Sequence, residues 1–281
     1  MKKKPRNLKE ALKNKLAKKE LNQLITSFDS IGNIAVIQVP DELEKKEKLI
    51  GNTLLKLNKQ FKTVCKVVSP RKGKYRVQEL KAIAGEKNFI AEYRESGCRF
   101  IFDVKKVFFS PRLSSERLRI AKEVRKGEVI GAFFAGVGPY PIVLAKNSLM
   151  KKAFAVEINP AAVKYMKENI ELNKCTEKIE VIKGDVKKIA STKLKNKCDR
   201  ILMPLPHGGE NYLASCLKAI KKGGIIHFYQ LTSINNPFEE PLKRVKEEVK
   251  KLKRKHKILY RKEVRPFSAT RVQVVIDFRV N

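Results

Sequence analysis

A glycine-rich segment, Phe134-Ala135-Gly136-Val137-Gly138-Pro139, follows an apolar run that predicts a strand over residues 129–134. Glycines at a strand-to-helix turn let a ligand approach the backbone, whose amide groups face it. Glu157 comes about 20 residues later, at the end of the next predicted strand, where its carboxylate can accept hydrogen bonds from both hydroxyls of a ribose. Together these features predict a nucleoside-containing cofactor; a tight turn beside a surface glutamate is the structural alternative.

Two neighbouring features bear on the choice of cofactor. The third glycine of a dinucleotide fingerprint is missing, because Tyr140 and Pro141 stand at its place. A second short motif, Gly184-Asp185-Val186, follows a predicted strand, and its acidic side chain and adjacent amide can bind the amino group and a ring nitrogen of adenine. These features favour S-adenosylmethionine over a nicotinamide dinucleotide, while a Gly-Asp pair is also common in plain turns.

Two more segments carry side chains suited to a reaction. Pro204-Leu205-Pro206 ends a predicted strand at the carboxyl edge of the sheet, where open α/β folds place their reacting groups, and it forms either a rigid rim over the cofactor's sulfonium or a structural turn. Ser110-Pro111-Arg112 begins a helix predicted to run to Val124. Arg112 and Glu116 lie four residues apart on one face of that helix, a spacing that also suits a simple ion pair.

The charge balance indicates a polyanionic partner. Among 281 residues, 63 Lys and Arg outnumber 29 Asp and Glu, so the formal net charge is +34. RNA is the expected partner, and a lysine-rich proteome accounts for part of the excess. No apolar run of about 18 residues and no signal peptide is visible, so we expect a cytoplasmic protein without a membrane contact. Five cysteines without a CxxC pair and three scattered histidines predict buried, reduced thiols and no metal site.

These segments require elements to position them. From residue 111 onward, strands and helices alternate and end in two consecutive strands, which predicts a Rossmann-like α/β fold with a mainly parallel sheet and an antiparallel edge. Strands are predicted over 129–134, 153–157, 179–182, 200–203, 225–230, 258–264 and 273–280, with helices over 138–147, 160–172, 209–221 and 237–252.

The first 110 residues follow another pattern. Leucines at 8, 12, 16 and 21 predict an amphipathic lead-in helix ending near residue 28, and short strands over 34–39, 63–68, 75–80, 89–93 and 99–104 predict a small α+β domain. The expected domains are a basic N-terminal extension (1–26), a small α+β RNA-facing domain (27–110) and an S-adenosylmethionine-binding domain (111–281).

From about residue 27 to its end, the sequence resembles the archaeal and eukaryotic-type tRNA (guanine-37 N1)-methyltransferases and the related wybutosine-pathway aminocarboxypropyl transferase. The resemblance implies a class I methyltransferase domain that transfers the methyl group of S-adenosylmethionine to N1 of the guanine 3′ of the anticodon in tRNA. The segments that carry it are residues 26–35, Tyr75-Arg76-Val77-Gln78-Glu79-Leu80, Glu95-Ser96-Gly97-Cys98-Arg99-Phe100, Phe109-Ser110-Pro111-Arg112-Leu113 with Glu116-Arg117, the glycine-rich segment, Glu157-Ile158-Asn159-Pro160 and Arg265-Pro266-Phe267-Ser268.

The resemblance also implies roles for single residues. Glu116 is the candidate base for the N1 proton, and Arg76 is the candidate partner of guanine O6, where charge develops. The residues expected at the substrate are Arg76, Phe108, Arg112 and Pro206, with Phe108 at a place where such enzymes often carry Tyr. The residues expected at the cofactor are Arg112, Phe134, Gly136, Gly138, Glu157, Asn159, Asp185, Val186 and Pro204.

Three departures from the family pattern qualify these roles. Gly131-Ala132 stands where many relatives have an acidic residue, and Pro204 stands where relatives often have Asn. Archaeal members commonly carry a separate N-terminal domain that reads tRNA shape, whereas only a Lys-rich stretch precedes the match here. Two outcomes are open: the basic residues of this stretch compensate through phosphate contacts, or tRNA selection is looser. These basic residues include Lys2, Lys3, Lys4 and Arg6.

Two rival functions remain open at this point. The aminocarboxypropyl transferase uses the same cofactor turned so that a different carbon faces the nucleophile; Glu116 favours methyl transfer, and the short N-terminus favours the rival. A non-catalytic RNA-binding protein on a methyltransferase scaffold is the alternative from another class, and the intact glycine-rich segment with Glu157 disfavours it. The sequence does not fix the oligomeric state, and a monomer is favoured.

Overall fold

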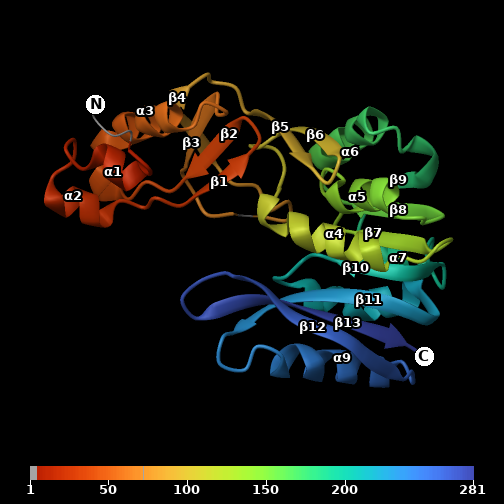
Figure 1. Ribbon diagram of the computed structural model, residues 1–281. Helices are drawn as coiled ribbons and strands as arrows, with labels where there is room; N and C mark the ends of the chain where they lie inside the picture. Colours follow the sequence, from red (N-terminus) through yellow and green to blue (C-terminus); the bar gives the residue numbers. More distant parts are fainter. Residues whose placement is uncertain (1–4, 72) are drawn as a thin grey trace. The chain divides into compact units, whose positions relative to one another are not determined.

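The computed structural model describes residues 5–71 and 73–281. The chain divides into two compact units, traced in Figure 1. The first comprises the residues up to Glu95 together with Arg99–Pro111, and the second comprises Ser96–Cys98 together with Arg112–Asn281. None of the helices in the described ranges is long and apolar enough to cross a bilayer.

The first unit is built on a four-stranded sheet with the order β1-β2-β3-β4. β1 pairs antiparallel with β2, β2 parallel with β3, and β3 antiparallel with β4. Leucines of the first helix pack with α3 and the sheet in one apolar core. The elements are α1 (Leu8–Leu12), α2 (Lys18–Gln23), β1 (Phe28–Ile31), β2 (Ile34–Ile37), η1 (Asp41–Lys46), α3 (Glu47–Leu57), β3 (Thr63–Val67), β4 (Leu80–Gly85) and the two-stranded β5 (Ile90–Glu95) and β6 (Cys98–Asp103).

The turn between β1 and β2 depends on Gly32 and Asn33. Gly32 has a φ of +59°, and a Cβ built on it would lie 1.9 Å from the carbonyl oxygen of Glu92, so no other residue fits without a shift of the backbone. The Asn33 side chain accepts a hydrogen bond from the Glu92 amide at 2.9 Å and donates one to the Ile90 carbonyl at 3.3 Å. The turn therefore ties β5 to the first hairpin.

Two sequence predictions for this unit are wrong. The lead-in helix is not continuous, because α1 ends at Leu12 and α2 starts only after Ala17, whose amide is capped by the Glu20 carboxylate at 2.8 Å; its first four residues lie outside the described ranges. The strand predicted over 75–80 is mostly a turn, in which Arg76 has a φ of +53°. β4 begins only at Leu80.

The second unit contains a seven-stranded sheet with the order β12-β13-β11-β10-β7-β8-β9. The pairs from β11 to β9 are parallel, and β13 pairs antiparallel with β11 and β12, so the mainly parallel sheet with an antiparallel edge is confirmed. Its strands are β7 (Val129–Phe133), β8 (Lys152–Glu157), β9 (Ile179–Lys183), β10 (Cys198–Met203), β11 (Ile220–Ser233), β12 (His256–Pro266) and β13 (Arg271–Val280).

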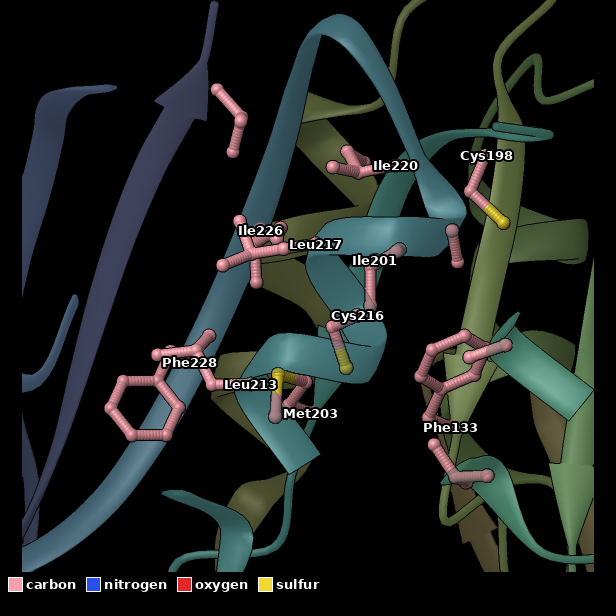
Figure 2. Packing of buried hydrophobic residues seen from close by; sticks show 14 of the residues in the cluster. Phe133, Cys198, Ile201, Met203, Leu213, Cys216, Leu217, Ile220, Ile226 and Phe228 are labelled. Atoms are coloured by element: carbon pink, nitrogen blue, oxygen red, sulfur yellow. The ribbon is translucent and has the colours of Figure 1, made fainter. Parts of the chain in front are cut away.

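Helices cover both faces of this sheet. α7, α8 and α9 pack on one face, where they share an apolar core with the strands; Figure 2 shows Leu213, Cys216 and Leu217 of α8 among residues of β10 and β11. α4 and α5 lie on the other side of the sheet from α9 (Figure 1). The helices and short turns are η2 (Pro111–Leu113), α4 (Ser114–Glu123), α5 (Pro139–Asn147), α6 (Pro160–Leu172), η3 (Thr176–Lys178), α7 (Val186–Ser191), η4 (Gly209–Tyr212), α8 (Leu213–Ala219) and α9 (Glu239–Lys251).

The central strands present different chemistry to the two faces. Side chains alternate along a strand, so Phe228 and Ile276 enter the apolar core while His227, Tyr229 and Asp277 point to the side of α4. All three of these polar side chains are almost completely buried. The face beneath α4 therefore holds a buried polar cluster.

The edge strand β12 is largely exposed along its length. Its pairing with β13 is interrupted by two register shifts, one between Ile258 and Tyr260 and one between Glu263 and Arg265. Four basic residues lie along the strand. They are Lys257, Arg261, Lys262 and Arg265.

All five cysteines are free and buried, as predicted. Burial raises the pKa of both the Cys65 and the Cys198 thiol to about 12. These thiols are therefore neutral packing groups at physiological pH.

Candidate functional site

The glycine-rich segment forms the turn between β7 and α5, and its backbone is unusual. Phe134, Gly136 and Gly138 all have positive φ values, of 55°, 56° and 90°. Gly138 is the N-cap of α5, and a Cβ on it would lie 3.0 Å from the Ile142 side chain and 3.1 Å from that of Met166. A side chain at Gly138 would therefore require the Ile142 and Met166 side chains to shift, in addition to the strain of the positive φ.

Glu157 at the end of β8 fixes this turn. Its Oε2 accepts a hydrogen bond from the Gly136 amide at 2.8 Å, and its Oε1 accepts bonds from the Ile158 and Asn159 amides, both at 2.8 Å. The carboxylate is half-buried. Three backbone donors thus orient the side chain that the sequence assigns to a ribose.

Two of the other predicted cofactor residues cap helices. The Asn159 side chain accepts a hydrogen bond from the Ala161 amide at 3.0 Å at the start of α6, and Asp185 accepts one from the Lys187 amide at 2.8 Å at the start of α7. The Gly184 amide donates to the Glu157 carbonyl at 2.9 Å, so the ends of β8 and β9 are joined. These contacts bring the ribose and adenine candidates to one edge of the sheet.

The turn after β10 is tied to the same edge. The Pro206 carbonyl accepts a hydrogen bond from the Leu231 amide of β11 at 2.7 Å. Pro204 and Pro206 are half-buried, while Val186 is buried. The Phe134 ring packs edge-on against Tyr212, with 4.9 Å between ring centroids, which fixes the first residue of the glycine-rich turn.

Glu116, the candidate base, is 5% exposed on α4 and accepts three hydrogen bonds. Arg119 donates to it through Nε at 2.9 Å and Nη2 at 2.6 Å, and the Tyr229 hydroxyl donates at 2.7 Å. An Arg fork on a carboxylate is a strong, geometrically specific contact. Arg112 lies in η2 rather than in the α-helix, and its side chain is exposed.

A tyrosine pair connects Glu116 to the glycine-rich turn. Tyr140, in the first turn of α5, donates to the Tyr229 hydroxyl at 3.4 Å, and Tyr229 in turn donates to Glu116. Burial raises the pKa of both phenols far above their usual values, so both remain neutral hydroxyl donors. Glu116 therefore lies two side chains away from the helix that follows Gly138.

The remaining two predicted residues belong to the first unit. Arg76 is half-buried in the turn before β4, and its amide donates to the Gly73 carbonyl at 3.2 Å. The Phe108 ring is half-buried, with the Arg71 guanidinium 4.7 Å from its centroid. An arginine and an aromatic ring in contact offer a surface on which a nucleobase can stack.

The departure at Gly131-Ala132 has a packing explanation. Both residues are buried inside β7. A Cβ on Gly131 would lie 3.0 Å from the Cys198 sulfur and 3.1 Å from the Ile201 side chain. An acidic side chain at 131 would therefore displace the Cys198 and Ile201 side chains and would be buried among apolar neighbours.

Sequence reasoning missed the polar cluster under α4. Arg119, His227, Tyr229 and Asp277 were not among the predicted site residues, although His227 and Asp277 each interrupt an apolar strand. Such an interruption was the available signal, because an ionisable side chain inside a core strand needs a buried partner.

Glu123, His227 and Asp277 place potential metal-ligand atoms within 4.8 Å of one another. The Arg200 guanidinium lies 2.7 Å from His227 Nε2, and the Arg119 guanidinium lies 2.7 Å from Asp277. Two cations already neutralise these groups, so the arrangement is an ion-pair cluster rather than a metal site.

Comparison with known proteins gives consistent matches along the chain. A family model described as the TRM5/TYW2 methyltransferase domain matches residues 91–259, and one described as the TYW2 N-terminal domain matches residues 8–88. The tRNA (guanine(37)-N(1))-methyltransferase Trm5b of Pyrococcus abyssi is 40% identical over 258 residues, which are 92% of this chain and 76% of that protein.

Solved structures agree with these matches. The complex of aTrm5 with tRNALeu superposes with a TM-score of 0.87 at 33% identity, over 99% of this chain and 79% of that one. The P. horikoshii TYW2 structure in complex with MeSAdo superposes with a TM-score of 0.80 at 25% identity, over 97% of both chains.

Proposed function

Because the chain belongs to the TRM5/TYW2 methyltransferase family, we propose that it is a tRNA (guanine-37 N1)-methyltransferase, which methylates N1 of the guanine 3′ of the anticodon. The observation that carries the proposal is the 40% identity, over 92% of the chain, to an enzyme of that name. The buried Glu116, linked through two tyrosines to the glycine-rich turn, supports it from the geometry.

The residues at the carboxyl edge of the sheet suit S-adenosylmethionine, which supplies an electrophilic methyl group when bound. Glu157 Oε2 accepts one backbone hydrogen bond, and a carboxylate oxygen can accept two, so it can also take a ribose hydroxyl. The positive φ and partial exposure of Gly136 suit close approach of a ligand. The residues that would hold the cofactor are Arg112, Phe134, Gly136, Gly138, Glu157, Asn159, Asp185, Val186 and Pro204.

Glu116 would accept the proton of guanine N1, which is held at neutral pH and must leave before or as N1 is methylated. Arg76 would stabilise the charge that develops on O6. Phe108, Arg112 and Pro206 would hold the nucleotide. The assignments of Arg76, Phe108 and Arg112 rest on their positions in the motifs. The target base must also leave its stack in the anticodon loop before these residues can reach it.

The partner of this enzyme would be the anticodon loop of tRNA. The formal charge of +34 favours a polyanion, and the solved complex of a relative contains tRNALeu. The cytoplasm is the proposed compartment because tRNA substrates are found there.

The direct test is to incubate the purified protein with an unmodified tRNA transcript and S-adenosylmethionine, followed by mass analysis of nuclease fragments. A gain of about 14 Da, one methyl group, on the guanine 3′ of the anticodon is expected. A tRNA in which that guanine is replaced by adenine is the matched control. No gain on the guanine-containing transcript would contradict the proposal.

A second function is favoured by one observation, the match of residues 8–88 to the TYW2 N-terminal domain. In that case the protein would transfer an aminocarboxypropyl group from the same cofactor to a wyosine-precursor tRNA. The same mass analysis on such a tRNA separates the two functions. No modification of either tRNA would favour a non-catalytic RNA-binding protein.

A further inference from the structure

A row of buried charged side chains leads from Glu116 into the sheet. Arg119 binds Glu116 with Nε and Nη2, and its Nη1 lies 2.7 Å from Asp277 Oδ2 and 2.6 Å from Glu123 Oε1. The Asp277 side chain is 2% exposed, whereas that of Glu123 is 41% exposed. One guanidinium therefore joins the candidate base to a second buried carboxylate on β13.

Asp277 is itself held by His227. The Nε2 atom of His227 lies 2.7 Å from Arg200 Nη1, and a guanidinium can only donate, so Nε2 accepts. The ring proton must then sit on Nδ1, which donates to Asp277 Oδ1 at 2.7 Å. Burial raises the pKa of Asp277, but its contacts with His227 and Arg119 more than offset burial and the pKa is lowered.

This arrangement matters when the proton moves. Before transfer, Arg119 is paired with two buried carboxylates, Glu116 and Asp277, and with the more exposed Glu123. When Glu116 takes the N1 proton it becomes neutral, and a largely buried guanidinium left with only the partly exposed Glu123 would be costly. Asp277 remains as the counter-charge of Arg119.

We propose that Arg119 is a positioning residue for Glu116, and that Asp277, oriented by His227, keeps Arg119 paired while Glu116 is protonated. The inference rests on the proposed function, because it takes Glu116 as the base. The N1 proton goes to a Glu116 oxygen, the N1 electron pair goes to the methyl carbon, and the electrons of the broken C–S bond stay on sulfur.

The other groups around Glu116 do not change in this scheme. Tyr229 donates to Glu116, and Tyr140 stands behind Tyr229, both as neutral hydroxyls. The Arg117 guanidinium lies 5.7 Å from the centroid of the Tyr140 ring, and the Tyr260 ring lies 4.6 Å from the Arg119 guanidinium. Substitutions at Arg119 and Asp277 therefore change the charge near Glu116 while these four neighbouring side chains stay the same.

The two substitutions are expected to shift the pH profile in opposite directions. Arg119→Gln removes the cation beside Glu116 and leaves Asp277, so protonation becomes easier and the acid limb of the transfer rate moves to higher pH. Asp277→Asn removes the anion and leaves Arg119, so protonation becomes harder and the acid limb moves to lower pH, with a lower plateau because the base is weaker. Each shift should be on the order of half a pH unit or more.

The experiment is single-turnover methyl transfer to a tRNA transcript across the pH range for the full chain, Arg119→Gln and Asp277→Asn. Asp199→Asn is the matched control, because Asp199 lies at the start of β10 and binds the Val129 amide and Lys221 instead. Arg119→Lys, which keeps the charge and loses the fork, replaces Arg119→Gln if that variant does not fold, and should move the limb to higher pH by less.

Opposite shifts with an unmoved control support the proposal. Unmoved midpoints, or shifts in the same direction, overturn it even where melting temperatures fall, since a merely structural role changes stability and not the midpoint. Glu116→Gln in the same series distinguishes the assignment of Glu116 as the base from the positioning role of Arg119 and Asp277. If Glu116→Gln retains full transfer, Glu116 is not the base and the proposed catalytic assignment fails; if it loses transfer while the midpoints stay unmoved, only the positioning role fails.

Discussion

Glu116 is oriented by Arg119 and Tyr229 within the second unit, so its carboxylate is in position without help from the substrate. We expect Glu116→Gln to keep the affinity for S-adenosylmethionine and to lower methyl transfer by ~10²–10⁴-fold, the usual contribution of a general base. Equilibrium dialysis and single-turnover transfer measure the two quantities. Glu248→Gln on α9, where Glu248 pairs with Lys251 of the same helix, is the matched control and should transfer at the normal rate. Normal transfer by Glu116→Gln would rule out Glu116 as the base.

Glu157 combines an expected contact with the cofactor's ribose and three hydrogen bonds from backbone amides. Glu157→Gln replaces one of two acceptor oxygens with an NH2 group that faces a backbone donor, and an unsatisfied amide costs about 1–3 kcal/mol. We therefore expect a lower melting temperature and weaker binding of S-adenosylmethionine. Thermal unfolding with and without the cofactor checks both effects. Unchanged binding would show that Glu157 only supports the turn.

At the scale of an element, the glycine-rich turn needs Gly138 for two separate reasons, its φ of +90° and its contacts with Ile142 and Met166. Gly223→Ala is a matched control, because Gly223 has a φ of +80° with no atom within 4 Å of an added Cβ. A left-handed alanine alone costs about 1–2 kcal/mol, so we expect Gly138→Ala to lower the free energy of unfolding by more than Gly223→Ala does. Denaturant unfolding measures the difference, and equal losses would mean that the contacts at Gly138 relax freely.

The elements of the second unit could largely be predicted from the sequence, because apolar runs and Gly or Pro signals mark their ends. β8 and α6 were placed to within a residue, since Pro160 marks the helix start. The short α7 was missed, because six residues show too little periodicity for a helix prediction. The lead-in helix failed for a local reason: leucine spacing fits one helix, while a capping contact between Ala17 and Glu20 starts a second.

The candidate site was predictable only where residues follow a motif along the chain. Glu157 and the glycine-rich turn do so, and the structure joins them through the Gly136 amide. The partners of Glu116 are remote in sequence, since Tyr229 is 113 residues away. His227 and Asp277 each interrupt an apolar strand, but no local pattern reports which residues across the sheet pair with them, so the partners become visible only in three dimensions.

For the whole molecule, the charge of +34 makes a measurable prediction about tRNA binding. Each phosphate contact releases counterions, so affinity should fall by about 10³-fold or more between low and moderate salt. Filter binding of a tRNA transcript over a salt series measures the slope. Binding of adenosine, which carries no net charge, is the control and should change little. A flat response for tRNA would mean that the basic excess reflects proteome composition rather than phosphate binding.

The edge strand β12 has a consequence for how copies of the protein behave in concentrated solution. An exposed edge can serve as a template for strand addition by another chain, which is one route to aggregation. On β12, Lys257, Arg261, Lys262 and Arg265 would face like charges on an incoming copy, and the two register shifts would spoil its hydrogen bonding. The charge of this strand thus opposes self-association, and acylation of Lys257 and Lys262 would remove two of those four charges and make strand addition at β12 easier.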